Sequence, residues 1–280
     1  MNDISTFEPL IIQLAPTGII PQKSDNPSVP ITPEEIAEDV SRCYKLGVSS
    51  VHVHARHGDG RPAFEKEIYE EIFEKIRRKC PDIIICASTS GRIFQNIKER
   101  SQVLELKPEM ATLSVGTVNF KNYPSINTLD SVQDLAGRMK RLGIKPELEI
   151  FEAGFINTAL YLVKKGYLVH PLHFNLFLGA LGSIPAGLRD VVYLVDSIPA
   201  GNTWSATGIG RFQIRINSAA IIMGGHVRVG LEDALYHHHA TRELATNEML
   251  VKRIVRIAHE VGREIATPED ARRILGLYPG

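Results

Sequence analysis

The chain has 280 residues, 44% of them hydrophobic, and its 32 lysines and arginines balance 32 aspartates and glutamates. The zero net charge offers no basic field for nucleic acid or a membrane surface, and no apolar run is long enough for a transmembrane helix. Only three cysteines, without a CxxC pair, and an acidic N-terminal segment indicate a cytoplasmic protein rather than a secreted, disulfide-bonded one.

Short apolar segments alternate with helical ones along the whole chain. Strands are predicted at residues 10–14, 50–55, 83–88, 110–115, 147–151, 173–178, 203–206 and 227–231. A first helix begins after Thr32, which is a good N-cap before Pro33. Further helices are predicted at residues 65–79, 96–106, 128–142, 157–165, 188–196 and 212–223, and a long helical tail at 241–275.

Eight strands, each followed by a helix, predict an α/β fold of the (β/α)8 TIM-barrel type. We expect residues 1–280 to form a single barrel domain with a C-terminal helical extension, because such barrels commonly run to about 250 residues. A doubly wound open sheet is the alternative, but no GxGxxG motif follows the first strand.

Two histidines stand two residues apart in the predicted strand at 50–55. Alternate side chains of a strand point to the same face, so His52 and His54 share a face near the C-terminal end of this strand. TIM-barrel enzymes place their catalytic groups at this end. Paired imidazoles can hold a metal, relay protons or grip an anion. The alternative is a pair of polar residues satisfied by backbone carbonyls.

The last predicted strand carries charges of both signs. Arg228 and Glu232 have the same parity, so both can face the barrel interior. A buried acid must be paired or bound to a metal, because an isolated charge there is costly. Glu232 can complete a His-His-Glu set with the two histidines, which is a ligand pattern of catalytic zinc sites. A structural pair between Arg228 and the acid is the alternative.

Hydroxyl side chains end other strands. Ser88 and Thr112 can cradle a carboxylate without adding charge, although a serine at a strand end is commonly a turn former. No GxSxG elbow is present, so Ser88 is not read as a nucleophile. The run His237-His238-His239 points in three directions, and we expect it to be exposed or oligomer-facing rather than metal-binding.

These motifs together resemble the β-keto acid cleavage enzyme family, whose founding activity is the cleavage of 3-keto-5-aminohexanoate. The resemblance runs almost end to end, through NPSVP at 26–30, TPEEIA at 32–37, HVHAR at 52–56, STSG at 88–91, ATL at 111–113, GT at 116–117, PLHFN at 171–175, GGHVRVGLED at 224–233 and REIATP at 263–268. It implies a zinc-bearing (β/α)8 barrel that assembles as a homotetramer. It also implies the reaction of a β-keto acid with acetyl-CoA, which yields acetoacetate and the acyl-CoA of the shortened acid.

The resemblance also implies a role for each motif residue. It assigns the zinc to His52, His54 and Glu232. It implies that Ser88 and Thr112 bind the carboxylate of the keto acid, and that Arg228 and Asp233 act as a pair at the reacting carbons. Asp233 would be the base, with Arg228 orienting it. Because Asp233 is out of phase with Glu232, it reaches the site only if the strand has ended before it.

One departure from the family pattern concerns the substrate tail. Members that take the amino-substituted substrate carry an acid after the first strand, and this chain has Ile20 at that place. We therefore expect a neutral or apolar tail rather than a cationic one. Arg92, just after Ser90-Gly91, has two interpretations. It can contact an anionic tail or a CoA phosphate, or it can be a solvated surface residue.

Two other functions stay open from the sequence. One is a CoA-independent, metal-dependent aldolase or retro-Claisen lyase, which acetyl-CoA dependence would separate from the transferase. The other is a barrel that binds a ligand without catalysing a reaction, against which the complete ligand set and the Arg228–Asp233 pair argue.

Overall fold

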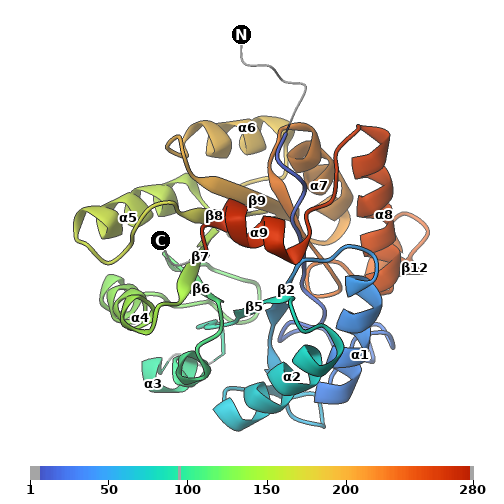
Figure 1. Ribbon diagram of the computed structural model, residues 1–280, viewed down its shortest axis with the longest axis horizontal. Coiled ribbons are helices and arrows are strands. Elements are labelled where there is room, and N and C mark those ends of the chain that lie inside the picture. Colours follow the sequence, from blue (N-terminus) through green and yellow to red (C-terminus); the bar gives the residue numbers. More distant parts are fainter. Residues whose placement is uncertain (1–6, 94–95, 278–280) are drawn as a thin grey trace.

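The computed structural model describes residues 7–93 and 96–277 of the chain. Eight parallel strands close into a barrel in the order β1-β10-β9-β8-β7-β6-β5-β2, which confirms the predicted TIM barrel (Figure 1). Their bounds are β1 (Ile12–Leu14), β2 (Ser50–Val53), β5 (Ile84–Ala87), β6 (Met110–Ser114), β7 (Lys145–Ile150), β8 (His173–Leu178), β9 (Thr203–Gly208) and β10 (His226–Val229).

Helices surround the barrel in Figure 1 and bury an apolar layer of Ile, Leu and Val side chains against it. They are α1 (Pro33–Tyr44), α2 (Lys66–Lys79), α3 (Ile97–Arg100), α4 (Leu129–Leu142), α5 (Ala153–Lys164), α6 (Leu188–Asp196), α7 (Gln213–Ile222) and α8 (Asn247–Glu260), with 3-10 turns η1 (Gln102–Leu106) and η2 (Gly210–Phe212). Thr32 caps α1 as predicted, because its hydroxyl accepts a hydrogen bond from the Glu35 N–H at 3.2 Å.

The predicted helical tail at 241–275 is wrong as one continuous element. Residues up to 244 belong to a hairpin of β11 (Tyr236–His238) and β12 (Glu243–Leu244), and α8 is separated from α9 (Pro268–Leu275). Gly262, with a φ of +72°, ends the first helix region, and Thr267 starts the next with a capping box. Another small hairpin, β3 (Ala55–Arg56) with β4 (Pro62–Ala63), follows β2.

The helix α9 covers the N-terminal end of the barrel. Its Ala271 and Leu275 pack in one buried cluster with Ile11, Ile84 and Met110, which stand at the beginnings of barrel strands. Because this end is covered, the C-terminal ends of the strands are the place for a pocket.

The barrel interior contains a hydrogen-bonded polar layer. Glu147 of β7 is buried and accepts hydrogen bonds from the side-chain amides of Gln13 and Asn175. Gln13 is in register with Arg228 of the neighbouring strand β10. Burial raises the pKa of Glu147, and such buried groups are tolerated because they have hydrogen-bond partners.

Two further findings concern the cysteines and the helices. All three cysteines, Cys43, Cys80 and Cys86, are buried and free. Among the described residues, no helix combines the length and the apolar character needed to cross a membrane.

Candidate active site

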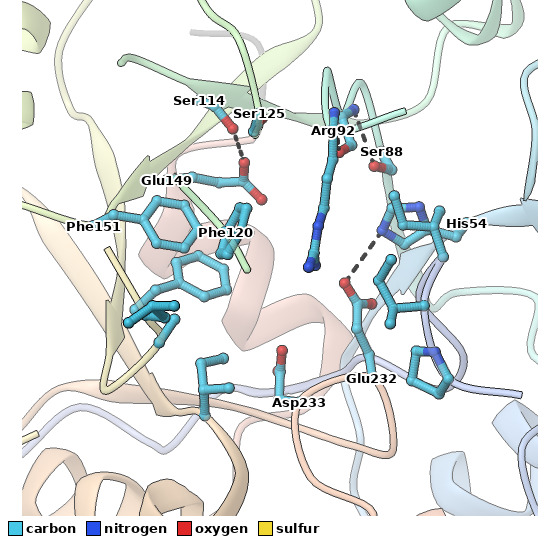
Figure 2. Close-up of a pocket in the computed structure, with 18 of the residues that line it drawn as sticks. His54, Ser88, Arg92, Ser114, Phe120, Ser125, Glu149, Phe151, Glu232 and Asp233 are labelled. Atoms are coloured by element: carbon cyan, nitrogen blue, oxygen red, sulfur yellow. Dashed lines mark hydrogen bonds and ion pairs between the residues drawn. The ribbon is translucent and has the colours of Figure 1, made fainter. Parts of the chain in front are cut away.

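A cavity of about 300 Å³ lies at the C-terminal end of the barrel. Figure 2 shows Phe120, Phe151 and Glu149 on one side of it and His54 and Glu232 on the other. One wall is therefore largely aromatic and the other is polar. Ligand pockets commonly combine an apolar surface with a few convergent polar groups.

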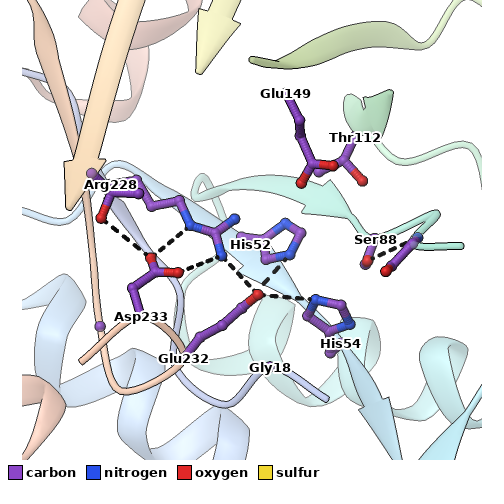
Figure 3. A network of polar contacts seen from close by, with 12 residues as sticks. Gly18, His52, His54, Ser88, Thr112, Glu149, Arg228, Glu232 and Asp233 are labelled. Carbon is purple, nitrogen blue, oxygen red and sulfur yellow. Dashed lines mark hydrogen bonds and ion pairs between the residues drawn. The ribbon is translucent and has the colours of Figure 1, made fainter. Parts of the chain in front are cut away.

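The two histidines meet Glu232, as the sequence predicts; His54 and Glu232 line the polar wall, and His52 is buried outside the lining. Their ring centroids lie 4.8 Å apart. The Nε2 atom of His54 is 3.2 Å from Oε1 of Glu232, and the Nε2 atom of His52 is 3.7 Å from Oε2 (Figure 3). Atoms of these three side chains that can bind a metal all lie within 4.8 Å of one another.

Glu232 reaches this place from a turn, and not from a strand as its parity suggested. Strand β10 ends at Val229, and the chain turns at Gly230, where φ is +157° and a Cβ would stand 2.1 Å from the carbonyl oxygen of Ala15. Gly18, with a φ of +64°, makes the space for the acid, because a Cβ there would lie 2.5 Å from Cγ of Glu232. The early end of β10 also removes the parity obstacle for Asp233.

Arg228 joins the two acids of this turn. Its Nε donates to Oδ2 of Asp233 at 2.9 Å, and its Nη2 lies 3.2 Å from Oδ1. The same Nη2 is 2.7 Å from Oε1 of Glu232. Arg228 and Asp233 are both buried, so this is a desolvated network in which each charge depends on the others.

The network moves the pKa values of its two acids in opposite directions. Burial alone would raise the pKa of Glu232, but Arg228 and the two histidines lower it well below its usual range. For Asp233, burial outweighs Arg228 and raises the pKa, and the nearby Glu232 adds to this. Glu232 is thus kept anionic, whereas Asp233 is a more basic carboxylate that can accept a proton.

The donor set fits a divalent metal such as zinc. Burial, with Arg228 nearby, lowers the pKa of His52 well below its usual range, so its imidazole is neutral and able to bind a metal. Oε2 of Glu232 is buried and has no hydrogen-bond partner in the described part of the chain. Two imidazoles and one carboxylate match the three protein ligands of a catalytic zinc.

A second trio around His52 does not fit a metal. Atoms of His52, Cys86 and Glu147 also lie within 4.8 Å of one another. However, the Glu147 carboxylate already accepts from Gln13 and Asn175. Burial raises the pKa of the Cys86 thiol well above its usual range, so it is no thiolate ligand.

Of the two residues predicted to hold the substrate carboxylate, only Ser88 lines the cavity. Ser88 lines the cavity directly after β5. Thr112 is buried in β6 and is not part of the cavity lining; its hydroxyl accepts from the Thr89 N–H at 3.1 Å, and the Thr89 hydroxyl donates to its carbonyl at 2.6 Å. Thr112 thus supports the loop that carries Ser88, and its contact with substrate stays a prediction.

Glu149 is a cavity residue that the sequence reasoning missed. It lies on β7, accepts a hydrogen bond from the hydroxyl of Ser114 on β6, and faces the cavity (Figure 2). Burial raises its pKa to about 7. Its signal was present in the sequence, because Glu147 and Glu149 alternate with the apolar Leu148 and Ile150 in a strand.

The triple histidine lies outside this cavity. His237 and His238 belong to β11, His238 and His239 are exposed, and none of the three lines the cavity. The exposure of His238 and His239 agrees with the expectation from the sequence, and His237 is partly buried.

The comparison with known proteins shows the family of this chain. A family model described as beta-keto acid cleavage enzyme matches residues 9–277. The chain belongs to the β-keto acid cleavage enzyme family. The match includes every residue of the site described above.

Characterised relatives cover nearly the whole chain. A 3-keto-5-aminohexanoate cleavage enzyme of Fusobacterium nucleatum is 44% identical over 97% of this chain and 99% of its own length. A 3-oxoadipate:acetyl-CoA acetyltransferase of Cupriavidus necator is 36% identical over 96% of this chain and 95% of its own length. A solved ternary complex of ObcA with a C4-CoA adduct and oxalate is 22% identical, with a TM-score of 0.80 over 89% of this chain and 68% of that one, which shows the shared fold.

Proposed function

We propose that this protein is an acyltransferase that reacts a β-keto acid with acetyl-CoA and releases acetoacetate and the acyl-CoA of the shortened acid. The main support is the meeting of the Arg228–Asp233 pair with the His52-His54-Glu232 set at one cavity in a member of this family. The name of the Cupriavidus relative also makes acetyl-CoA its co-substrate.

Zinc is the proposed cofactor, held by His52, His54 and Glu232. When bound there, it would supply Lewis-acid polarisation of the keto oxygen, which makes the carbon between the two carbonyl groups more acidic. The buried Oε2 of Glu232 without a hydrogen-bond partner supports this assignment. Arg228 holds the opposite side of the same carboxylate at 2.7 Å and so fixes its orientation.

Asp233 is the proposed base. It takes a proton from C2 of the keto acid, and the electron pair left on C2 attacks the acetyl carbonyl of acetyl-CoA, which expels the CoA thiolate. The thiolate then attacks the original keto carbon. The bond between C2 and that carbon breaks, and the electron pair left on C2 takes back the proton held by Asp233, which gives the new acyl-CoA and acetoacetate. Arg228 keeps the Asp233 carboxylate in place through two hydrogen bonds during both steps.

The substrate assignment rests on the lining of the cavity. Ser88 is the proposed contact of the carboxylate next to C2, with Thr112 beneath it. Ile20 lines the same cavity and offers no carboxylate to an ammonium group. The tail is therefore neutral or apolar rather than cationic, unlike the amino-substituted substrate in the name of the Fusobacterium relative.

A product assay with purified protein tests this function. β-Keto acids with neutral, cationic and anionic tails are incubated with and without acetyl-CoA, and acetoacetate and new acyl-CoA are followed by mass spectrometry. Acyl-CoA that forms only with acetyl-CoA, and that is abolished by chelation and by His52→Ala, supports the proposal. Cleavage of the keto acid without acetyl-CoA would instead indicate a metal-dependent lyase.

Three further expectations concern the whole protein. A homotetramer, which the family resemblance implies, is tested by light scattering. A single domain over residues 1–280 predicts one cooperative unfolding transition. A cytoplasmic location is tested by fractionation of the native host.

A further inference from the structure

Arg92 is a cation of the cavity that the mechanism does not use. It follows the Ser88-Thr89-Ser90-Gly91 segment after β5, is partly buried, and lines the cavity. Figure 2 shows its side chain extending into the cavity rather than out to solvent. Of the two readings that the sequence left open, the structure therefore favours the pocket residue.

Contacts of both the side chain and the backbone hold Arg92 in position. Its guanidinium carbon lies 4.2 Å from the ring centroid of Phe120, and Phe120 packs edge-to-face on Phe151 with centroids 5.4 Å apart. Its backbone N–H donates to the hydroxyl of Ser90. The buried side chain of Arg100 anchors the same segment by donating to the Thr89 carbonyl at 2.8 Å. The guanidinium is therefore held in place before any ligand arrives.

Among the residues that the structure describes, none accepts a hydrogen bond from the guanidinium of Arg92. Its Nε is buried without a hydrogen-bond partner, and no carboxylate of the described residues lies within 4.0 Å of its guanidinium. Other buried arginines differ: Arg56 donates to three backbone carbonyls, and Arg263 also donates to several. A partly desolvated cation without partners is unfavourable unless a ligand supplies the anion.

The acids of the cavity are engaged elsewhere. Glu232 and Asp233 are paired with Arg228, and Glu149 accepts a hydrogen bond from Ser114. In Figure 2 Arg92 starts from the side of the cavity opposite to Asp233, and its guanidinium reaches into the middle of the cavity, where a bound substrate would meet it. Ile20 adds no acid that would compete for it.

We propose that Arg92 binds an anionic group at the tail of the β-keto acid, so that keto acids ending in a second carboxylate are the preferred substrate class. This inference rests on the proposed function for the reaction, and it replaces the neutral or apolar tail argued from Ile20 with an anionic one. A carboxylate fits a planar guanidinium through two parallel hydrogen bonds. Such a pair would satisfy the donors that the protein leaves unpartnered.

The test compares Arg92→Gln with the parent on two keto acids of equal length, one ending in a carboxylate and one in the corresponding carboxamide. The parent should prefer the carboxylate. Arg92→Gln should lower kcat/KM for it by about 10- to 100-fold, as expected for a lost charged hydrogen-bonded pair. The carboxamide substrate and the KM for acetyl-CoA should change by less than about threefold. Arg92→Lys should restore part of the loss.

A matched control is Arg211→Gln. Arg211 also lies over an aromatic ring, with its guanidinium carbon 4.8 Å from the Phe212 centroid, but it is exposed and does not line the cavity. This variant should leave both substrates unchanged.

Three results would overturn the inference: an equal fall for both tails, a raised KM for acetyl-CoA with every keto acid, or a parent enzyme without preference for the carboxylate. Calorimetric titration of the dicarboxylate without acetyl-CoA separates this inference from the proposed function. If no keto acid is converted, binding that weakens about 10-fold or more in Arg92→Gln still supports the anion site, and binding equal to that of the parent refutes it.

Discussion

Replacement of Asp233 by asparagine removes the proposed base and keeps the shape of the side chain. The amide oxygen can still accept one of the two hydrogen bonds from Arg228, at the position where Nε now donates over 2.9 Å. Glu232, at 2.7 Å from the same guanidinium, continues to balance its charge. We therefore expect folding to survive, with a loss of stability of about 1–3 kcal/mol from the missing charged hydrogen bond.

The effect on the reaction should be larger. An amide cannot take the C2 proton, and general base catalysis typically contributes about 10²- to 10⁴-fold. We expect Asp233→Asn to lower kcat for acetoacetate formation by this factor, with bound zinc unchanged. The assay follows acetoacetate under saturating substrates, alongside metal analysis and thermal unfolding.

Asp39→Asn is the matched control for this variant. Asp39 is also a buried carboxylate with an arginine partner, at 2.6 Å from Arg42, but it lies on α1 and does not line the cavity. It should lower stability and leave kcat within about twofold. A kcat of Asp233→Asn within tenfold of the parent would refute the role of Asp233 as the base.

Further variants test the other parts of the site. Glu232→Gln should reduce the zinc content measured by atomic emission to well below one per chain; full occupancy would contradict its role as a ligand. Gly18→Ala should weaken zinc binding about 10-fold or more, because its Cβ would displace Glu232, and an unchanged affinity would show that the turn adapts. Glu149 has its folded pKa raised to about 7, so its contribution to stability is complete at low pH and is lost as the pH rises to 7. Because Glu149 lines the cavity, we discount this effect to about 1–2 kcal/mol. The free energy of unfolding of Glu149→Gln, measured by urea titration, should rise by that amount relative to the parent between pH 5 and pH 8. A difference between the two proteins that does not change with pH would contradict the raised pKa. Ile20→Glu should lower kcat/KM for an anionic tail and raise it for a cationic one, and no change in this ratio would remove Ile20 from the tail site.

Local patterns were sufficient to predict the barrel and the two histidines among the three proposed ligands. His52 and His54 share a face because a strand alternates its side chains, and this needs no knowledge of the rest of the chain. The alternation of strands and helices likewise predicts the closed sheet without any contact information.

The remaining site residues depend on contacts that a local pattern does not contain. Glu232 and Asp233 lie in a turn whose path is set by Gly230 against Ala15 and by the space at Gly18, more than 200 residues away in the sequence. Glu149 becomes part of the cavity only because β7 pairs with β6 and places it beside Ser114. The division of the C-terminal helices could have been read from Gly262 and Pro268, and was missed because the helical pattern on both sides is strong.

The most direct test of the central claim is the fate of the acetyl group. The protein is incubated with an unlabelled β-keto acid and acetyl-CoA that carries ¹³C at the carbonyl carbon, and the acetoacetate is examined by NMR. Transfer predicts that the label appears at the keto carbon of acetoacetate, while the acyl-CoA that forms with it carries no label. Unlabelled cleavage products, with the acetyl-CoA intact, would contradict the account.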